Sequence, residues 1–526
     1  MNGKLLKSLL MVLMITCTSI DYVKSQSIVG AYGNHAGSHG ALLNPSSLTT
    51  SGVYADFGLN LGLSACNSYF HIPSADAFKA VFDKSFKMSF TKIINGFPRD
   101  FDLDFNYGST KRATTNVGAD AVVLSGMYNF RGRHAVGFFA RTRANVDVHK
   151  FPSEILEVCM VGFDHNYRIN DGDPADTTVY YTQYARNYSG KNVNVGIMAW
   201  SELGLSYSTV VFNRFRHRVD LGVNAKVAMS VGAVALSSKK LDYHLELGDS
   251  IGMNDSVWFF DRMTGGLAYS LPLGYDTYFT VDGDFNDDLI KNRIAGFGGG
   301  IDVGVTYTRL RNSRAEGRLK RNCEISPVDY IWRLGFSVID LGAVYFGNDA
   351  EVSEYDTKNA ELNTERFNDV NTVHEFMDVV NEAFDSEIER KGFWMGLPTS
   401  LSLQFDYSFN RHFFVNAVVI QPVAITKYHV MRDAQMLLSP RFESQWFDVT
   451  IPVTVVNYNR LLLGASFRAA FLTVGTQNLL NLIGVGELYG LDLYVSLKFN
   501  FNRGKCLTDR YEDCLKPYHV SKKHGR

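Results

Sequence analysis

The chain has 526 residues, a formal net charge of −2 and 13% aromatic residues, with 45 glycines but only 12 prolines. A charge so close to zero gives no reason to expect nucleic acid as a partner, and the apolar content argues against a disordered chain. Many glycines and aromatics with little proline favour a large β-structure with glycine-containing turns.

The first 25 residues have the layout of a secretory signal peptide. Lys4 and Lys7 give a positive start, residues 9–15 are apolar, and residues 23–25 form a plausible cleavage site before Gln26. No later stretch has the roughly 18 apolar residues that a membrane-spanning helix needs. The mature protein is therefore expected to be secreted, periplasmic or an outer-membrane barrel.

The cysteines predict neither a disulfide framework nor a zinc site. Five follow the signal peptide, and they are sparse and lack CxxC-type spacing. Only Cys506 and Cys514 lie close together, where a small disulfide loop and free thiols are equally compatible with the sequence.

Residues 26–52 are small, turn-forming and nearly uncharged. Such a segment could lie inside a polar-walled lumen as a plug and bond to the wall through its Asn and His side chains; the alternative is a flexible leader. His35 and His39 could share a metal only on a helix, which the neighbouring glycines disfavour. The candidate plug residues are Asn34, Gly37, His39, Asn44 and Pro45.

From residue 53 onward, apolar and polar residues alternate with the period of a β-strand. Several runs reach the roughly 9–11 residues that cross a bilayer, and together they predict about 14 antiparallel strands. Clear alternation covers residues 53–63, 134–149, 216–231, 301–308, 401–410, 447–455 and 491–501. Weaker candidates lie near 120–130, 193–207, 257–270, 330–347, 412–425, 434–444 and 460–471.

The charged residues indicate which face of these strands is wet. An Arg or Lys facing lipid at the bilayer midplane costs about 2–4 kcal/mol, so the rows that carry charges should face the lumen and the apolar rows should face lipid. Aromatics near strand ends, such as Phe138, Phe139, Tyr494, Phe499 and Phe501, are expected to form interfacial girdles. A soluble β-sandwich remains the alternative. The lumen-facing candidates are Arg141, Arg143, Asp147, Arg218, Asp220, Lys226, Asp406, Asp492 and Lys498.

Several insertions do not alternate. Residues 368–392 predict an amphipathic helix with a Thr372/Glu375 capping box, an acidic face and an end near Arg390, which could cover the barrel mouth or dock a partner. Residues 74–95 predict a second helix. Residues 151–191 and 233–256 are expected to be polar loops, and 311–329 a basic loop.

No motif for catalysis is present in the sequence. The GFGGG run at 296–300 lacks the third glycine of a dinucleotide loop and leads into a strand. Residues 282–293 begin like a calcium loop, but Asp287 and Arg293 stand where an EF-hand needs Gly and Glu; loose calcium binding there or at 171–176 stays open. We expect no enzymatic activity, no cofactor and no metal.

The segment GAYGNHAGSHGALLNPSSLTTSGVYADFGLNLGL (residues 30–63), with Asn34, Gly37 and the Asn44-Pro45-Ser46 motif, resembles the N-terminus of an uncharacterised outer-membrane barrel family of Bacteroidota. That family is related to FadL-like fatty-acid transporters and PorV-like barrels. Further similarity runs through residues 131–146, 397–410, 437–468 and 471–484. Serine in place of the usual alanine after Asn-Pro is a mild departure. The resemblance implies a plugged barrel of about 14 strands and carries over no ligand.

The sequence thus predicts an all-β, transmembrane antiparallel barrel with an N-terminal plug-like segment and a few short helices in loops. The expected division is a signal peptide (1–25), a plug segment (26–52), a barrel (53–503) and a C-terminal tail (504–526). We expect outer-membrane localisation, contact with outer-membrane lipid, and either transport of a small hydrophobic or amphipathic molecule or an envelope-assembly role. A non-conducting structural or docking barrel is the alternative.

Overall fold

The computed structural model describes most of the barrel region but neither end of the chain. The expected signal peptide, the second helix at 74–95, the calcium-like loops, the basic residues 312–329 and the tail at 504–526 lie outside the described residues. The described residues are 31, 33–67, 70–73, 104–105, 114–130, 133–152, 188–247, 256–270, 294–311, 330–347, 350–363, 373–386, 388–389, 391–444, 446–482, 487–488 and 490–501.

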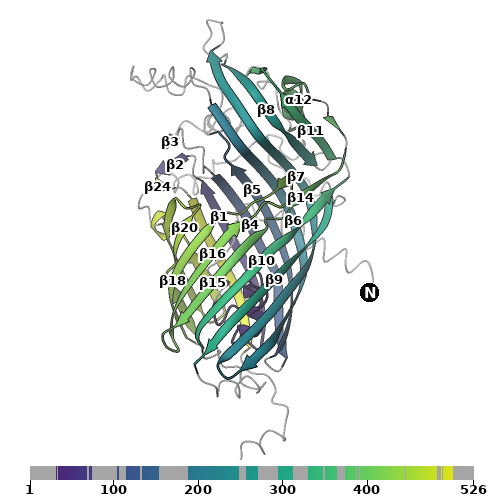
Figure 1. Ribbon diagram of the computed structural model, residues 1–526. Helices are drawn as coiled ribbons and strands as arrows, with labels where there is room; N and C mark the ends of the chain where they lie inside the picture. Colours follow the sequence, from purple (N-terminus) through teal and green to yellow (C-terminus); the bar gives the residue numbers. More distant parts are fainter. Residues whose placement is uncertain are drawn as a thin grey trace, which may run out of the picture.

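The strands close into a 14-stranded antiparallel barrel, as predicted, and a β-sandwich is excluded (Figure 1). The last strand pairs with the first from Ala55↔Phe501 to Cys66↔Gly490, which leaves the wall without a free edge. In order around the wall, the strands are β1 (Ala55–Asn67), β4 (Thr114–Phe130), β5 (His134–His149), β6 (Tyr188–Arg214), β7 (His217–Leu247), β9 (Gly296–Leu310), β10 (Tyr330–Phe346), β14 (Phe393–Gly396) with β15 (Ser400–Ser408), β16 (Phe413–Pro422), β18 (Gln435–Glu443), β19 (Phe447–Thr450) with β20 (Val453–Val456), β21 (Arg460–Leu463) with β22 (Ala465–Ala469), β23 (Leu472–Thr476) and β25 (Gly490–Phe501).

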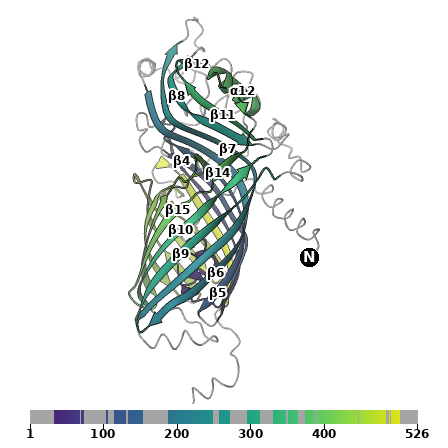
Figure 2. The ribbon, with the colours of Figure 1, turned by 45° about the vertical axis from the view of Figure 1, so that its right-hand side comes forward.

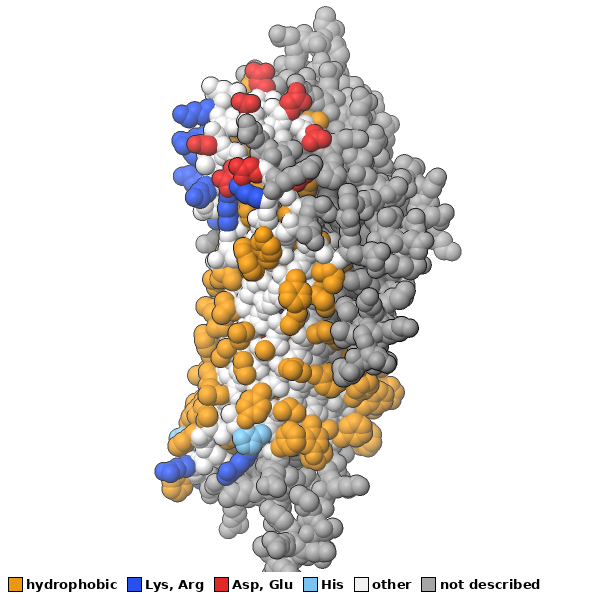
Figure 3. Space-filling view, turned by 90° about the vertical axis from the view of Figure 1, so that its right-hand side faces the viewer, with side chains coloured by type: hydrophobic (Ala, Val, Ile, Leu, Met, Phe, Trp, Pro, Cys, Tyr) orange, Lys and Arg blue, Asp and Glu red, His pale blue; other side chains and the backbone are white. Residues whose placement is uncertain are grey.

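The final strand, β25, shows how the sequence sets the two faces of the wall. Ser496 and Lys498 are buried inside, whereas Leu493, Phe499 and Phe501 are 37%, 48% and 55% exposed on the outside. This alternation repeats around the barrel, and Figure 3 shows hydrophobic side chains spread over the wall, with charged side chains above this band and at its lower rim. The outer surface therefore has the apolar character that lipid contact requires.

Two aromatics expected in the interfacial girdles point inward instead. Tyr494 is 1% exposed and Phe139 is 4% exposed, because each falls on the inner row of its strand. Phe138, the neighbour of Phe139, is 44% exposed and does lie on the outer surface. The alternation along each strand therefore predicts which aromatics face lipid better than their clustering near a strand end does.

The two ends of the barrel differ. At the lower end in Figure 1, residues 215–216 join β6 to β7, and residues 470–471 join β22 to β23. The longest connections at the upper end are residues 68–113 between β1 and β4 and 150–187 between β5 and β6, although residues 457–459 make a short turn there between β20 and β21. At the lower end, residues 311–329 separate β9 from β10. In outer-membrane barrels the short turns face the periplasm and the long loops face outward.

The upper end carries a sheet extension that stands above the barrel (Figures 1 and 2). The second half of β7 pairs with β8 (Ser256–Ser270), which in turn pairs with β11 (Ala350–Thr357) and β12 (Ala360–Asn363). Short β13 (Ile388–Glu389) pairs with β11, and α12 (Val373–Ala383) lies beside these strands.

The upper end of the structure corrects four expectations. Residues 233–247 are not a loop but continue β7, because Leu241 and Tyr243 alternate into a separate core with Phe260 of β8. Residues 188–191 likewise belong to β6, and the strand near 257–270 lies outside the barrel wall. The helix ends at Ala383 rather than near Arg390, because Phe384 enters the same core and Asp385 takes a left-handed conformation with φ +49°.

The remaining elements are short: β2 (Phe70–Pro73), β3 (Asp104–Phe105), β17 (Tyr428–His429), β24 (Glu487–Leu488), α2 (Gly37–Gly40), α3 (Ser47–Thr50) and α13 (Leu479–Leu482). Among the described residues, no helix is long and apolar enough to cross a membrane. The GFGGG run lies within β9 itself rather than in a loop before it.

Candidate functional site: the plug and the lumenal cavity

Residues 33–52, the plug, lie inside the barrel towards its lower end, where α2 and α3 form the purple ribbon in Figure 1. Asn34, His39 and Asn44 are only 1%, 6% and 2% exposed. The candidate plug residues therefore lie in the lumen, surrounded by the polar rows of the wall.

The Asn44-Pro45-Ser46 motif forms a tight turn against the wall. The Oδ1 atom of Asn44 accepts hydrogen bonds from the backbone N of Ser46 (3.1 Å) and from its Oγ (2.7 Å). The Nδ2 atom of Asn44 donates to Oε1 of Gln404 on β15 (3.0 Å), and Ser46 Oγ lies 2.6 Å from Oγ1 of Thr306 on β9. One asparagine thus closes the turn and also ties it to the barrel.

Three glycines on adjacent strands, Gly222 of β7, Gly304 of β9 and Gly335 of β10, provide the room for this turn. A Cβ on Gly222 would lie 2.2 Å from the carbonyl carbon of Pro45, and one on Gly304 would lie 2.1 Å from Asn44 Oδ1. A Cβ on Gly335 would lie 2.9 Å from Asn44 Nδ2. We call this recess the glycine hollow; any larger side chain there would collide with the plug.

The C-terminal end of the plug is held by a buried ion pair. Arg218 donates to both carboxylate oxygens of Asp220, and its Nη2 also donates to the backbone oxygen of Thr49 (2.8 Å). Thr49 Oγ1 donates to Asp220 Oδ1 (2.8 Å) and lies 2.8 Å from Oγ of Ser208. Both members of the pair therefore bond to the plug as well as to each other.

The N-terminal end of the plug bonds to charged side chains on several strands of the wall. Asn34 Nδ2 donates to Oε2 of Glu443 (2.7 Å), and the Lys498 ammonium donates to the carbonyl oxygens of His35 and Ala36, the latter at 2.7 Å. The backbone N of Ser38 donates to Oδ2 of Asp56 (2.7 Å).

Glycine at position 37 is required by its surroundings. Gly37 has φ +52°, and a Cβ there would fall 1.7 Å from Asp56 Oδ2. Although the glycines argued against a helix, residues 37–40 do form one helical turn. His35 and His39 nevertheless take separate partners, Asp448 (3.5 Å) and Ser496 (3.4 Å).

Above the plug, buried charges span the lumen. Asp340 of β10 accepts hydrogen bonds from Arg143 Nη1 (3.0 Å), from the Lys226 ammonium and from Arg432. Asp340 has φ +57° and sits at a register shift of β10, which turns its side chain into this group. We call the group the septum; its four cations and four carboxylates are Arg141, Arg143, Lys226, Arg432, Asp120, Glu202, Asp302 and Asp340.

Residues 423–434, the inserted segment between β16 and β18, reach the wall from inside the barrel. The carbonyl of Met431 accepts hydrogen bonds from Nδ2 of Asn116 (2.7 Å) and Asn145 (2.8 Å), and its N donates to Asp147 Oδ1 (2.9 Å). This anchoring places the next residue, Arg432, in the septum.

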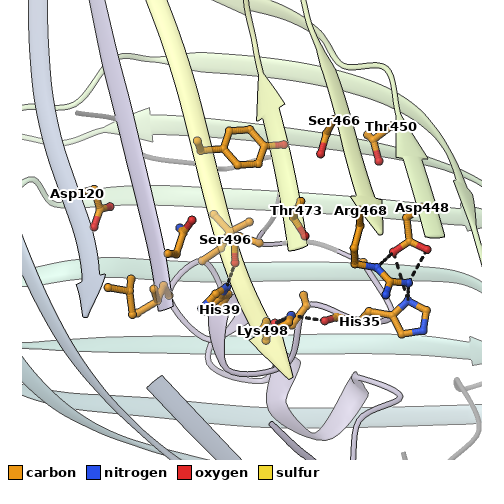
Figure 4. Close-up of a pocket in the computed structure, with 18 of the residues that line it drawn as sticks. His35, His39, Asp120, Asp448, Thr450, Ser466, Arg468, Thr473, Ser496 and Lys498 are labelled. Atoms are coloured by element: carbon orange, nitrogen blue, oxygen red, sulfur yellow. Dashed lines mark hydrogen bonds and ion pairs between the residues drawn. The ribbon is translucent and has the colours of Figure 1, made fainter. Parts of the chain in front are cut away.

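The lumenal cavity lies between the plug, the septum and the wall from β18 to β25 (Figure 4). It encloses about 1020 Å³ of space not filled by atoms, including the part open to solvent. The plug lines it through His35, His39, Leu42 and Leu43, and the septum through Asp120, Arg141 and Arg432. Figure 4 shows Thr450, Ser466, Thr473 and Ser496 on its walls.

The cavity lining is rich in charge. The lining cations outnumber the carboxylates, and Arg468 pairs with Asp448 while Arg441 pairs with Glu443 (2.6 Å). Leu42, Leu43 and Val122 add an apolar patch. Five cations, Arg141, Arg432, Arg441, Arg468 and Lys498, face three carboxylates, Asp120, Glu443 and Asp448.

All nine lumen-facing candidates are buried inside the barrel, but they serve different groups. Arg141, Arg143 and Lys226 belong to the septum, Arg218 and Asp220 hold the plug, and Asp147 holds the inserted segment. Asp406 pairs with Arg441 (2.9 Å), Asp492 accepts from the backbone N of Gln477 (2.9 Å), and Lys498 bonds to the plug.

Sequence reasoning missed several residues of the site. Arg441, Asp448 and Arg468 lie on the polar rows of alternating strands, so the same pattern could have found them. Asp340 interrupts its strand and Arg432 lies outside any strand, so neither carried that signal. Among the described residues, no group of three His, Cys, Asp or Glu side chains is arranged to hold a metal.

Comparison with solved structures finds other barrels. The P. putida toluene transporter TodX is 10% identical over 92% of this chain and 100% of its own, with a TM-score of 0.33. A TodX monoaromatic hydrocarbon channel mutant is 9% identical over 90% and 100%, with a TM-score of 0.36. A Pseudomonas aeruginosa FadL homologue is 9% identical over 89% and 96%, with a TM-score of 0.25. Values this low say nothing about what this chain binds.

A search of curated protein sequences finds no match. The family model described as "Family of unknown function (DUF5723)" matches residues 59–477, which cover the wall from β1 to β23. The chain therefore belongs to this family of unknown function.

Proposed function

We propose that this chain is an exported outer-membrane barrel that binds a small amphipathic molecule in the lumenal cavity and passes it through when part of the plug moves. The apolar outer face and the unequal ends of the barrel support a place in the outer membrane. The observation that carries the proposal is the cavity itself, which lies directly against the plug and offers charges beside an apolar patch.

The plug divides into two parts according to its contacts. Residues 44–52, the plug base, fill the glycine hollow and bond to the Arg218–Asp220 pair. Residues 33–43, the plug head, border the open space of the cavity instead and bond to charged side chains such as Glu443. Because the base is wedged into a recess of the wall and the head is not, the base is the fixed part, and displacement of the head would connect the cavity to the lower end of the barrel.

Two engineered disulfides test this division. Ser38→Cys with Ser125→Cys would lock the head, since the two hydroxyls lie 3.1 Å apart. Thr49→Cys with Ser208→Cys would lock the base across a 2.8 Å contact. In a background with the native cysteines replaced by serine, conductance in planar bilayers should disappear on oxidation of the head pair and return on reduction, while the base pair should have no effect.

The single-cysteine variants are the controls. If both disulfides reduce the conductance equally, the base is not a fixed part. If the conductance stays the same when the head disulfide forms, the plug head does not gate the barrel. A wild-type barrel that never conducts would favour the alternative below.

A non-conducting docking barrel is the second candidate. Two observations favour it: the plug and the septum fill much of the lumen, and the β7–β8–β11 extension stands above the barrel with its own core. A photoreactive residue at Asp378 of α12 should then crosslink one defined envelope protein in intact cells. The same group placed at Leu205, on the outer face of the wall, is the control, and identical products at both positions would argue against docking at α12.

A further inference from the structure

We propose that the lumenal cavity binds an oxyanion, the carboxylate or phosphate group of a small molecule, through Arg432, Arg441 and Lys498. The inference rests on the proposed function, because it concerns the same cavity, and it adds the chemical group that the cavity selects.

The first reason is that two of the buried arginines lining the cavity have guanidinium donors without a partner among the described residues. Arg441, 4% exposed, donates from Nε to Glu443 and from Nη2 to Asp406 (2.9 Å), while its buried Nη1 has no partner among the described residues. Arg432, 8% exposed, donates to Asp340, while its Nε is likewise unmatched there. A buried donor without an acceptor is unfavourable, so both arginines favour an acceptor-rich guest.

The second reason is the state of Lys498. Its ammonium carries three protons, and it donates to the carbonyl oxygens of His35 and Ala36. Among the described residues, no carboxylate lies within ion-pairing distance of this ammonium, although the side chain is only 8% exposed. Lys498 therefore offers a proton and a positive charge that no direct counter-ion balances.

The charge of the lining decides between ligand classes. Five cations and three carboxylates line the cavity, and Asp340 and Asp406 behind the lining also bond to Arg432 and Arg441. The charge of Lys498 is therefore the one that favours a negative guest over a neutral or positive one. Hydroxyls of Thr450, Ser466 and Thr473 supply further donors to its oxygens. Water could satisfy the free donors but could not balance the charge of Lys498. Hydrogen bonds from these cations to an oxyanion are also stronger than those to water, because both partners are charged.

Equilibrium dialysis of the full-length protein in phosphate-free detergent tests the inference, with radiolabelled inorganic phosphate and acetate as probes. We expect saturable binding of at least one probe. Lys498→Met should weaken it by about tenfold, since one charge-assisted hydrogen bond is lost. The control is Lys240→Met, because Lys240 lies on the upper part of β7, outside the barrel wall, and pairs with Asp242 (2.8 Å). This variant should bind the probes as the wild type does.

A second variant keeps the inference testable if the Lys498→Met protein does not fold. Ser466→Asp keeps all three donors but adds a negative charge to the cavity wall, so it should also weaken binding. The shift of the band on heating in a gel verifies the folded barrel in each variant. Absence of saturable binding to wild type, or equal binding by the Lys498 and Lys240 variants, would overturn the inference.

The same assay separates two sources of the oxyanion. If dihexanoyl phosphatidic acid displaces phosphate and binds at least tenfold more tightly, the group belongs to a lipid; if it does not compete, the ligand is a free small anion. Both results support the oxyanion site. Because binding is measured without flux, failure here leaves the head-disulfide experiment informative, and failure of gating leaves this result standing.

Discussion

Individual glycines decide whether the plug can be seated. The glycine hollow receives Asn44 and Pro45 so closely that Gly222, Gly304 and Gly335 have no room for a side chain on the lumen side. Position 304 is the clearest case, because its Cβ would lie 2.1 Å from a side-chain oxygen that already accepts two hydrogen bonds. Asn44 would have to leave its turn to make room.

We therefore expect Gly304→Ala to destabilise the seated plug by about 1–3 kcal/mol, the usual cost of overpacking. Hydrogen–deuterium exchange of the amides of residues 33–52 should accelerate while the wall strands stay protected. Gly118→Ala is the matched control, since its Cβ would come no closer than 3.2 Å to Asn145 Oδ1. Similar acceleration in both variants would show that the hollow is not specific to the plug.

His39 should make plug seating depend on pH. Burial, aided by the charge of Lys498, lowers the pKa of His39 to about 3 from the ordinary 6.5. The seated plug therefore favours the neutral imidazole, while a released plug binds a proton below pH 6.5. The seating free energy is complete above that pH and is lost as the pH falls, by roughly 2 kcal/mol at pH 5.

Amide exchange of residues 33–52, corrected for the intrinsic pH dependence, should then rise about 30-fold between pH 7.5 and pH 5. His39→Gln, which cannot take up a proton, should abolish this rise. A rise of the same size in the His39→Gln protein would assign the effect to other groups.

At the scale of the strand, neighbouring residues face opposite sides of the wall, one towards lipid and the next towards the lumen. On β23, Val474 is 40% exposed on the outer face, and its neighbour Thr473 lines the cavity. Val474→Arg should impair insertion, because an arginine facing lipid costs about 2–4 kcal/mol at the midplane. Thr473→Arg should insert normally, since the cavity has room for the longer side chain.

Folding into liposomes, followed by the heat-dependent band shift, measures both variants side by side. Equal insertion of the two proteins would invalidate the assignment of faces.

Alternation allowed the barrel to be predicted because lipid outside and a polar lumen inside impose opposite demands on successive residues. Arg141 and Lys498 could be placed in the lumen for that reason. Their partners could not be predicted, because pairing depends on which strands meet across the barrel. Asp340 and Arg432 were not predicted to face the lumen, since a register shift and an inserted segment bring them together without any periodic pattern in the sequence.

For the whole molecule, the septum is the barrier between the cavity and the upper end. Asp340 alone accepts hydrogen bonds from Arg143, Lys226 and Arg432, so it joins β5, β7 and the inserted segment. Asp340→Asn should weaken this barrier and raise the bilayer conductance of the reduced head-pair variant, because three buried cations lose their shared counter-charge. Asparagine accepts the left-handed backbone of this position, so the change tests charge rather than backbone strain.

Asp356→Asn in the exposed extension serves as the control and should leave conductance unchanged. A conductance that is the same in the Asp340 and Asp356 variants would mean that the septum does not limit passage.

The contacts of Lys498 with the plug also have a consequence for the order of folding. This residue belongs to the last strand, yet it bonds to carbonyls 462 and 463 residues earlier, and Asn34 bonds to Glu443 across 409 residues. Contacts so distant in sequence form late, because the intervening chain must be ordered first. Residues 33–43, which precede the wall strands, therefore make their contacts with Glu443 and Lys498 only after β25 has joined β1, and a chain truncated before β25 would keep these residues accessible to proteases.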